Sequence, residues 1–202
     1  MLLKLVLAST NKGKIAEFRE LLADLPFELA SLADYQEIPK VVEDGSTFAE
    51  NAFIKASAIA KYTGELTLAD DSGLEVDALN GEPGIYSARY GQPGWNDRER
   101  YQYLLNKLQG VPFEKRTARF RCAVALYNPR TGRIDQSDGT VEGIIIDETR
   151  GDNGFGYDPV FFIPELGKTM AELSEEEKNS FSHRGRAVGI MIPCLMGLKF
   201  EL

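Results

Sequence analysis

The stretch LKLVLASTNKGKIAEFRELLADL, residues 3–25, decides how the fold of this chain begins. Its first five residues are mostly apolar, as in a short strand. Apolar residues then recur at helical spacing, from Ile15 through Phe18 to Leu25. A polar turn at residues 9–14 separates the two segments. A strand, a tight turn and a helix in this order predict the start of an α/β fold.

The polar turn is also a candidate anion site, because the start of a helix directs free backbone N–H groups and the positive end of its dipole outward. Ser9 and Asn11 add side chains that form hydrogen bonds, Gly13 permits close approach, and Lys14 supplies a mobile positive charge. The spacing is not that of a Walker P-loop. Taken alone, the turn is equally compatible with an ordinary exposed basic segment.

Further elements continue the α/β pattern outward from this start. Thr47 and Glu50 form a capping-box pattern before a second helix, and residues 66–69 form a short apolar strand that ends at Asp70 and Asp71. The order of elements predicts one α/β domain, residues 1–202, with a mixed sheet. The other predicted elements are a helix capped by Asn96 and Glu99, a long strand at 117–127 entering a hairpin, strands near 140–146 and 160–163, a glycine-rich loop at 151–156, and a helix after Ser174.

Composition narrows the class of protein. A length of 202 residues with 43% hydrophobic content suits one compact domain, with room for two lobes.

The sequence contains no apolar run that approaches the ~18 residues of a membrane span. The apolar start is too short for a signal peptide, so we expect a soluble cytoplasmic protein. The net charge of −8 argues against broad nucleic-acid binding. Cys122 and Cys194 are too far apart in sequence to suggest a disulfide framework or a zinc site.

Two adjacent carboxylates, Asp70 and Asp71, follow the apolar strand at a place where α/β proteins collect ligands. Neighbouring side chains on a strand diverge, so we expect one carboxylate to serve a metal or a water and the other a different partner. Glu43 and Asp44, in the loop before the second helix, can add another carboxylate, and oxygen ligands without histidine favour Mg²⁺ over zinc. A turn rich in Asp, Ser and Gly is the alternative. Lys55, one helical turn after Asn51, is by itself more typical of a solvated lysine.

The segment GFGYDP, residues 154–159, is followed downstream by Lys178 and by SHR at residues 182–184. Glycines on both sides of Phe155 let its ring lie on an exposed loop, where it can stack on a base. Asp158 can accept and Arg184 can donate a hydrogen bond, which suits a purine with a 6-oxo group and an N1 proton. The single histidine of the chain, within SHR, is by itself more typical of a structural or helix-capping group.

Together these segments resemble the family of non-standard purine nucleoside triphosphate pyrophosphatases, the ITPase and XTPase enzymes, over nearly the whole chain. The motifs are specific and stand in the order of the family. They are SxNxxK at residues 9–14, TFAENAFIKA at 47–56, ADDSGLEVDAL at 69–79, PGIYSARY at 83–90, GFGYDPVFF at 154–162 and KNSFSHRG at 178–185.

The resemblance implies a particular architecture. We expect an elongated α/β fold with two lobes around an active-site cleft, a long curved mixed β-sheet flanked by helices, and a homodimer. The C-terminal segment departs from the family pattern, because Gly189, Pro193 and Gly197 interrupt the amphipathic helix that usually ends the chain. Whether this segment is helical is therefore left open.

The resemblance also implies roles for individual residues. Asp71 matches the position of a metal ligand and general base, and Glu43 and Asp70 match acidic positions beside the metal. Lys14 and Lys55 match lysines that contact the phosphates and assist catalysis. The positions expected to bind substrate are Ser9, Thr10, Asn11, Lys12, Gly13, Lys14, Ser72, Phe155, Gly156, Tyr157, Asp158, Lys178, His183 and Arg184.

We therefore expect a Mg²⁺-dependent hydrolase that converts ITP, dITP or XTP to the monophosphate and pyrophosphate and so cleanses the nucleotide pool. Its partner would be a small purine nucleotide, with no nucleic acid and no membrane. A pyrophosphatase for modified pyrimidines, as in the Maf-like relatives, is a weaker alternative, because those proteins lack the combination of GFGYDP and SHR. The other alternative is a non-catalytic nucleotide-sensing protein on the same scaffold, against which the paired aspartates argue.

Overall fold

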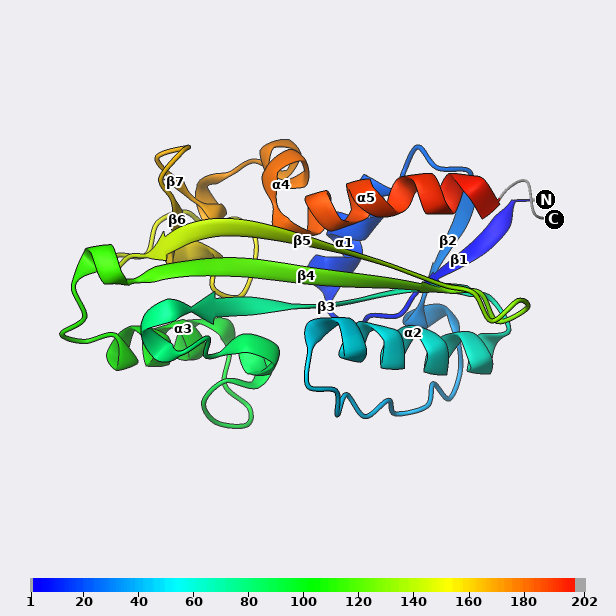
Figure 1. The fold of residues 1–202 in the computed structure, drawn as a ribbon, viewed down its shortest axis with the longest axis horizontal. Coiled ribbons are helices and arrows are strands. Elements are labelled where there is room, and N and C mark those ends of the chain that lie inside the picture. Colours follow the sequence, from blue (N-terminus) through cyan, green and yellow to red (C-terminus); the bar gives the residue numbers. More distant parts are fainter. Residues whose placement is uncertain (1, 199–202) are drawn as a thin grey trace. The chain divides into compact units, whose positions relative to one another are not determined.

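The computed structural model describes residues 2–198 and confirms an α/β protein with a mixed sheet flanked by helices (Figure 1). In this part of the chain seven strands form one sheet in the order β2-β1-β3-β4-β5-β6-β7. β1 pairs in parallel with β2 and β3, whereas β6 is antiparallel to both β5 and β7. The strands are β1 (Leu3–Leu7), β2 (Phe27–Ser31), β3 (Leu66–Val76), β4 (Thr117–Tyr127), β5 (Ile134–Ile145), β6 (Phe161–Ile163) and β7 (Lys168–Thr169).

The helices begin at the capping residues that the sequence indicates. Asn96 with Glu99 and Ser174 with Glu177 form complete capping boxes. Thr47 accepts a hydrogen bond from the backbone N–H of Glu50. None of the helices within residues 2–198 is both long and apolar enough to cross a membrane. The α-helices are α1 (Lys12–Leu21), α2 (Phe48–Thr63), α3 (Asp97–Lys107), α4 (Glu175–Phe181) and α5 (His183–Gly197).

The described chain folds as two compact units. The first unit comprises residues 2–71, 122–139 and 184–198, and the second comprises residues 72–121 and 140–183. Each unit has its own hydrophobic core. Because β3, β4 and β5 contribute residues to both units, the division falls within strands and not at a linker.

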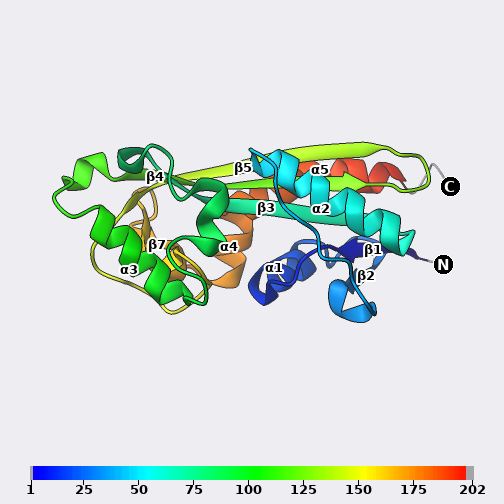
Figure 2. The ribbon, with the colours of Figure 1, turned by 90° about the horizontal axis from the view of Figure 1, so that it is seen from below.

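The core of the first unit lies between its strands and two helices. Leu5 and Leu7 of β1 pack with Phe18 of α1 and with Met191 of α5, all of them almost fully buried. Alternate residues of a strand face opposite sides of the sheet, so a second layer is needed on the other face. That layer is α2, which lies on the opposite side of the strands from α5 (Figures 1 and 2). Burial of the small residue Ala56 lets this helix approach closely.

The core of the second unit is built around the other ends of the long strands. Leu74 of β3, Phe120 of β4 and Val141 of β5 pack in one cluster with Leu104 of α3 and Phe161 of β6. The rings of Phe120 and Phe161 lie 4.5 Å apart between centroids, a spacing typical of stabilising aromatic pairs.

One expectation from the sequence is wrong, and one question that the sequence left open is answered. The strand predicted at residues 66–69 continues to Val76, so Asp70 and Asp71 lie inside β3 and not at its end. Aspartate and glycine are poor strand formers, but both carboxylates find buried partners here, and tertiary contacts outweigh that preference. The C-terminal segment is helical from His183 to Gly197 despite Pro193, because its apolar face is buried in the core.

Candidate active site

The polar turn after β1 leads directly into α1. The side chain of Asn11 caps the helix by accepting a hydrogen bond from the backbone N–H of Lys14 at 3.1 Å. Ser9 Oγ accepts from the N–H of Asn11 at 3.2 Å. Thr10 and Lys12 are exposed, so the turn presents its polar groups at the start of a ten-residue helix. This geometry suits an anion, because the helix dipole and the backbone donors act in the same direction.

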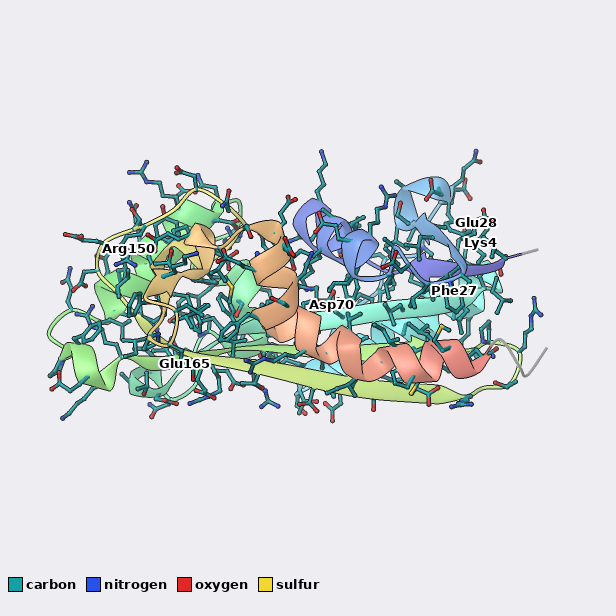
Figure 3. The ribbon with its side chains drawn as sticks, turned by 90° about the horizontal axis from the view of Figure 1, so that it is seen from above. Lys4, Phe27, Glu28, Asp70, Arg150 and Glu165 are labelled. Carbon is teal, nitrogen blue, oxygen red and sulfur yellow. The ribbon has the colours of Figure 1, made fainter. Side chains whose placement is uncertain are left out.

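Asp70 is buried beside this turn and holds two cations. It is 2% exposed, and its Oδ2 lies 2.8 Å from Lys14 Nζ and accepts a hydrogen bond from Arg184 at 3.1 Å. Figure 3 shows Asp70 near α1 and the beginning of α5. Burial alone would raise the pKa of Asp70, but the charges of Lys14 and Arg184 hold it well below its usual range. Asp70 therefore stays ionised and orients both cations.

Arg184 links the first turn of α5 to α1. Its side chain is 1% exposed and forms a second ion pair with Glu17, and its guanidinium lies over the ring of Phe18. Burial would lower the pKa of Arg184, but the carboxylates of Asp70 and Glu17 raise it, so the side chain stays a cation. Sequence reasoning missed Glu17, whose only signal is its position one turn after Gly13 on the helix that begins at the polar turn.

Asp71, the next residue of β3, has different partners because its side chain points to the other side of the strand. Its Oδ2 accepts a hydrogen bond from Asn51 Nδ2 of α2 at 3.1 Å. Burial raises the pKa of Asp71, and the positive charges of Lys55 and Lys14 only partly offset this. A buried carboxylate with a raised pKa and positive charges nearby is a group that can bind or activate a water.

Lys55 forms an ion pair with Glu43, whose Oε2 lies 2.7 Å from its Nζ. Both side chains are partly exposed, at 16% and 31%. Lys55 is therefore not merely a solvated lysine of α2, since its charge also acts on Asp71. The structure brings Lys55, Glu43 and Asp71 together within the first unit.

The carboxylates of this unit include two that could contribute ligands to a divalent ion. Among residues 2–198, no three His, Cys, Asp or Glu side chains gather closely enough to hold a metal by themselves. Asp71 and Glu43 can supply two oxygen ligands. Mg²⁺ usually takes one or two protein carboxylates and completes its shell with waters and phosphate oxygens. These two carboxylates could therefore bind a divalent ion only if water or a bound anion supplied its other ligands.

In the second unit a buried ion pair fastens the glycine-rich loop. Asp158 Oδ2 lies 2.7 Å from Lys178 Nζ and accepts a hydrogen bond from the backbone N–H of Phe155 at 3.0 Å. Lys178 Nζ also lies 4.9 Å from the centre of the Phe155 ring. Gly154 has a φ of +78°, and a Cβ at this position would overlap Oδ2 of Asp158. The loop conformation around the ring therefore depends on glycine at position 154.

Two further residues, which sequence reasoning missed, hold the same loop. The backbone N–H of Gly156 donates to Asp97 Oδ2 at 2.8 Å, and the hydroxyl of Tyr157 donates to the carbonyl oxygen of Ser87 at 2.9 Å. Ser87 Oγ also accepts from the backbone N–H of Leu74 in β3 at 2.9 Å. Ser87 lies within PGIYSARY, one of the motifs that carry the family resemblance.

His183 is buried at 5% exposure, and its ring stacks on Phe120 with centroids 4.9 Å apart. This environment agrees with the structural interpretation of a lone histidine.

Asp158 and Arg184, which were expected to recognise the base together, belong to different units. Asp158 forms an ion pair with Lys178, and Arg184 forms one with Asp70. The predicted substrate-binding positions of the second unit are Ser72, Phe155, Gly156, Tyr157, Asp158, Lys178 and His183; the others belong to the first.

The fold and the side-chain clusters define a class of α/β proteins in which a strand-to-helix turn lies beside buried carboxylates and lysines. The sequence matches the model of the Ham1 family over residues 5–194. A match of this extent shows that the chain belongs to the Ham1 family.

Individual relatives support this assignment. The chain is 52% identical over 186 residues to a dITP/XTP pyrophosphatase of Desulforamulus reducens, covering 92% of each chain. It is 53% identical over 188 residues to a dITP/XTP pyrophosphatase of Geobacter sulfurreducens, covering 93% of this chain and 94% of the relative. The solved structure of a HAM1 protein from Coxiella burnetii superposes with a TM-score of 0.87 at 44% identity and covers 97% of this chain and 100% of its own.

Proposed function

We propose that this protein hydrolyses the non-standard purine nucleoside triphosphates dITP, ITP and XTP to the monophosphate and pyrophosphate. The observation that carries the proposal is that two lysines pair with carboxylates around Asp71: Lys14 lies 2.8 Å from the adjacent Asp70, and Lys55 lies 2.7 Å from Glu43. The names of the relatives, dITP/XTP pyrophosphatase, supply the substrate class. A cluster of lysines and carboxylates is suited to a reaction in which negative charge is neutralised as a phosphate leaves.

In this mechanism the phosphates bind at the turn of residues 9–14, and Lys14 and Lys55 neutralise the triphosphate. Asp71 orients a water and accepts its proton as the water oxygen attacks the α phosphorus. The bond from the α phosphorus to the bridging oxygen breaks, and pyrophosphate leaves with that oxygen. Mg²⁺ held by Asp71 and Glu43 would supply further charge neutralisation, and Asp70 is the third acidic position proposed beside it. In the described structure Asp70 already orients Lys14 through an ion pair.

The second unit supplies the proposed base-binding residues. The ring of Phe155 would stack on the purine, and the loop of Gly156, Tyr157 and Asp158 would line its edge. Lys178 keeps this loop in place through its ion pair with Asp158. The contribution of Arg184 and His183 to recognition of the 6-oxo group, and that of Ser72 to the nucleotide, are further parts of the proposal.

We further propose that residues 1–202 act as a single hydrolase domain, and the near full-length match to the relatives supports this. The resemblance also suggests a homodimer, and the cytoplasm as the compartment because the nucleotide pool is there. The net charge of −8 supports a small substrate in place of a nucleic-acid partner.

A substrate panel tests the proposed function directly. Purified protein is incubated with dITP, ITP, XTP, dGTP, ATP and a modified pyrimidine triphosphate, with and without Mg²⁺, and pyrophosphate release is followed. We expect kcat/KM for the first three to exceed that for ATP by at least about 10²-fold, because the 6-amino group of adenine would leave a donor aimed at a 6-oxo group unpaired. The comparison with dGTP, which has the same 6-oxo group and N1 proton, measures the effect of the 2-amino group alone. Binding of dITP without pyrophosphate release would indicate a nucleotide sensor and contradict the proposal.

A further inference from the structure

Asn51 lies in the candidate site, but no role in the proposed reaction has been given to it. It lies in the first turns of α2 and is 1% exposed. Its Oδ1 accepts a hydrogen bond from the backbone N–H of Gly45 at 2.9 Å, and its Nδ2 donates to Asp71 Oδ2 at 3.1 Å. Because a backbone N–H can only donate and an ionised carboxylate can only accept, the two bonds define the orientation of the amide.

These two bonds connect Asp71 to the loop that carries Glu43. Gly45 follows Glu43 by two residues in that loop, and Glu43 itself pairs with Lys55 at 2.7 Å. Asn51 and Lys55 are four residues apart on α2 and therefore lie on the same face of the helix. One face of α2 thus contacts both carboxylates, Asp71 through Asn51 and Glu43 through Lys55.

The packing of Gly45 shows that this connection is close. A Cβ built at Gly45 would lie 2.8 Å from Asn51 Oδ1 and 2.7 Å from the Cβ of Glu50. The loop backbone is therefore in direct contact with the first turns of α2. The Asn51 amide is therefore in contact with both the loop backbone and the Asp71 carboxylate.

We propose that Asn51 is a positioning residue for the hydrolysis, whose amide sets the direction of the Asp71 carboxylate and its spacing from Glu43. This inference rests on the proposed function, because in that function Asp71 orients the attacking water and Asn51 would hold Asp71 in place. It does not require Asn51 to touch the nucleotide. A residue of this kind is expected to affect turnover more than binding, because it acts on the geometry reached in the transition state.

Two variants separate the bond to Asp71 from the bond to Gly45. Asn51→Leu has a similar volume and removes both bonds. Asn51→Asp keeps the shape and the acceptor for the N–H of Gly45, but replaces the donor to Asp71 with a second carboxylate. We expect both variants to lower kcat for dITP by about 10²-fold, the effect of misplacing a reacting group by roughly 1 Å.

Binding is measured separately from turnover. The dissociation constant of the magnesium complex of α,β-imido-dITP, in which the bond to be cleaved is replaced, is measured by calorimetry for each variant. We expect it to rise by less than about tenfold, well below the loss in kcat, because Lys14, Lys55 and the turn at residues 9–14, which would hold the phosphates, keep their own contacts in both variants. A loss of binding as large as the loss in kcat would overturn the inference.

A matched control accounts for stability. Ile59→Val removes a methylene at a fully buried position of the same helix without touching either bond, and thermal unfolding is followed for all the proteins. The control is expected to keep the wild-type kcat. If Asn51→Leu does not fold, Asn51→Asp, which has the native shape, carries the test.

The outcomes distinguish this inference from the proposed function. A wild-type protein that binds the analogue but releases no pyrophosphate from dITP overturns both. An active wild type with an equally active Asn51→Asp variant overturns the inference alone, since the bond to Gly45 would then be the one that matters. An active wild type with two folded, nucleotide-binding and slow variants supports it.

Discussion

The two units of the molecule use buried charge in different ways. In the first unit Asp70 pairs with both Lys14 and Arg184, and Asp71 lies within the field of two lysines. In the second unit the buried pair of Lys178 and Asp158 fastens a loop that carries an aromatic ring. In the first unit a buried carboxylate thus orients two cations, whereas in the second unit a buried pair holds an aromatic loop in place.

A second contrast lies within the first unit, between two adjacent aspartates. The pKa of Asp70 is held well below its usual range by Lys14 and Arg184, whereas burial raises the pKa of Asp71. Neighbouring side chains on a strand face opposite sides, so two identical residues meet different surroundings. Opposite environments for paired carboxylates are typical of sites where one orients cations and the other does chemistry.

The largest expected effect tests this second contrast. Asp71→Asn keeps the shape of the side chain but cannot accept the proton of the attacking water. We expect kcat for dITP to fall by about 10²- to 10⁴-fold, the usual contribution of a general base. Steady-state pyrophosphate release measures it, with circular dichroism to show that the variant is folded.

Asp138→Asn, at an exposed position of β5 in the same unit, is the matched control and should retain wild-type turnover. Near-normal turnover of the Asp71→Asn variant would refute the assigned role.

The next effect is on stability and tests the interpretation of the second unit. Lys178→Met leaves the buried carboxylate of Asp158 without this cation, and we expect the free energy of unfolding to fall by about 3 kcal/mol or more. Urea unfolding followed by tyrosine fluorescence measures the change. Lys168→Met, which removes a cation from an exposed ion pair with Glu177 at 2.7 Å, should cost about 1 kcal/mol or less. Equal losses for the two variants would show that burial of the first pair has no structural role.

The smallest effect is on substrate binding in the first unit. Lys14→Ala removes a cation from the proposed phosphate site while Arg184 still neutralises Asp70. We expect the KM for dITP to rise by about 10- to 10²-fold with a smaller change in kcat, because hydrogen bonds to charged groups contribute ~1.5–3 kcal/mol. Arg19→Ala, on the exposed face of α1, controls for the loss of a positive charge from the same helix. An unchanged KM for Lys14→Ala would contradict the proposed contact.

Local patterns in the sequence predicted the local structure well. Asn96 with Glu99 and Ser174 with Glu177 cap their helices as expected, because a cap depends on residues three positions apart. Asn11, which the sequence indicated only as a hydrogen-bonding residue of the polar turn, also caps its helix.

Contacts between distant segments could not be predicted in this way. The ion pair of Arg184 with Asp70 joins residues 114 positions apart, and the hydrogen bond of Asn51 to Asp71 depends on how α2 packs on β3. For the same reason the sequence did not reveal that β3 continues through its two aspartates, or that α5 continues through Pro193. The residue types of the candidate site could be predicted from motifs, but their partners required the fold.

The two glycines that flank Phe155 have different tolerances to substitution. Both have a positive φ, +78° at Gly154 and +64° at Gly156, which disfavours most side chains. At Gly154 the space is also occupied by the carboxylate of Asp158, whereas a Cβ at Gly156 would meet nothing within 4 Å. In a library of random variants, position 154 would therefore retain glycine alone, while position 156 would also admit asparagine and aspartate, which enter left-handed backbone most readily.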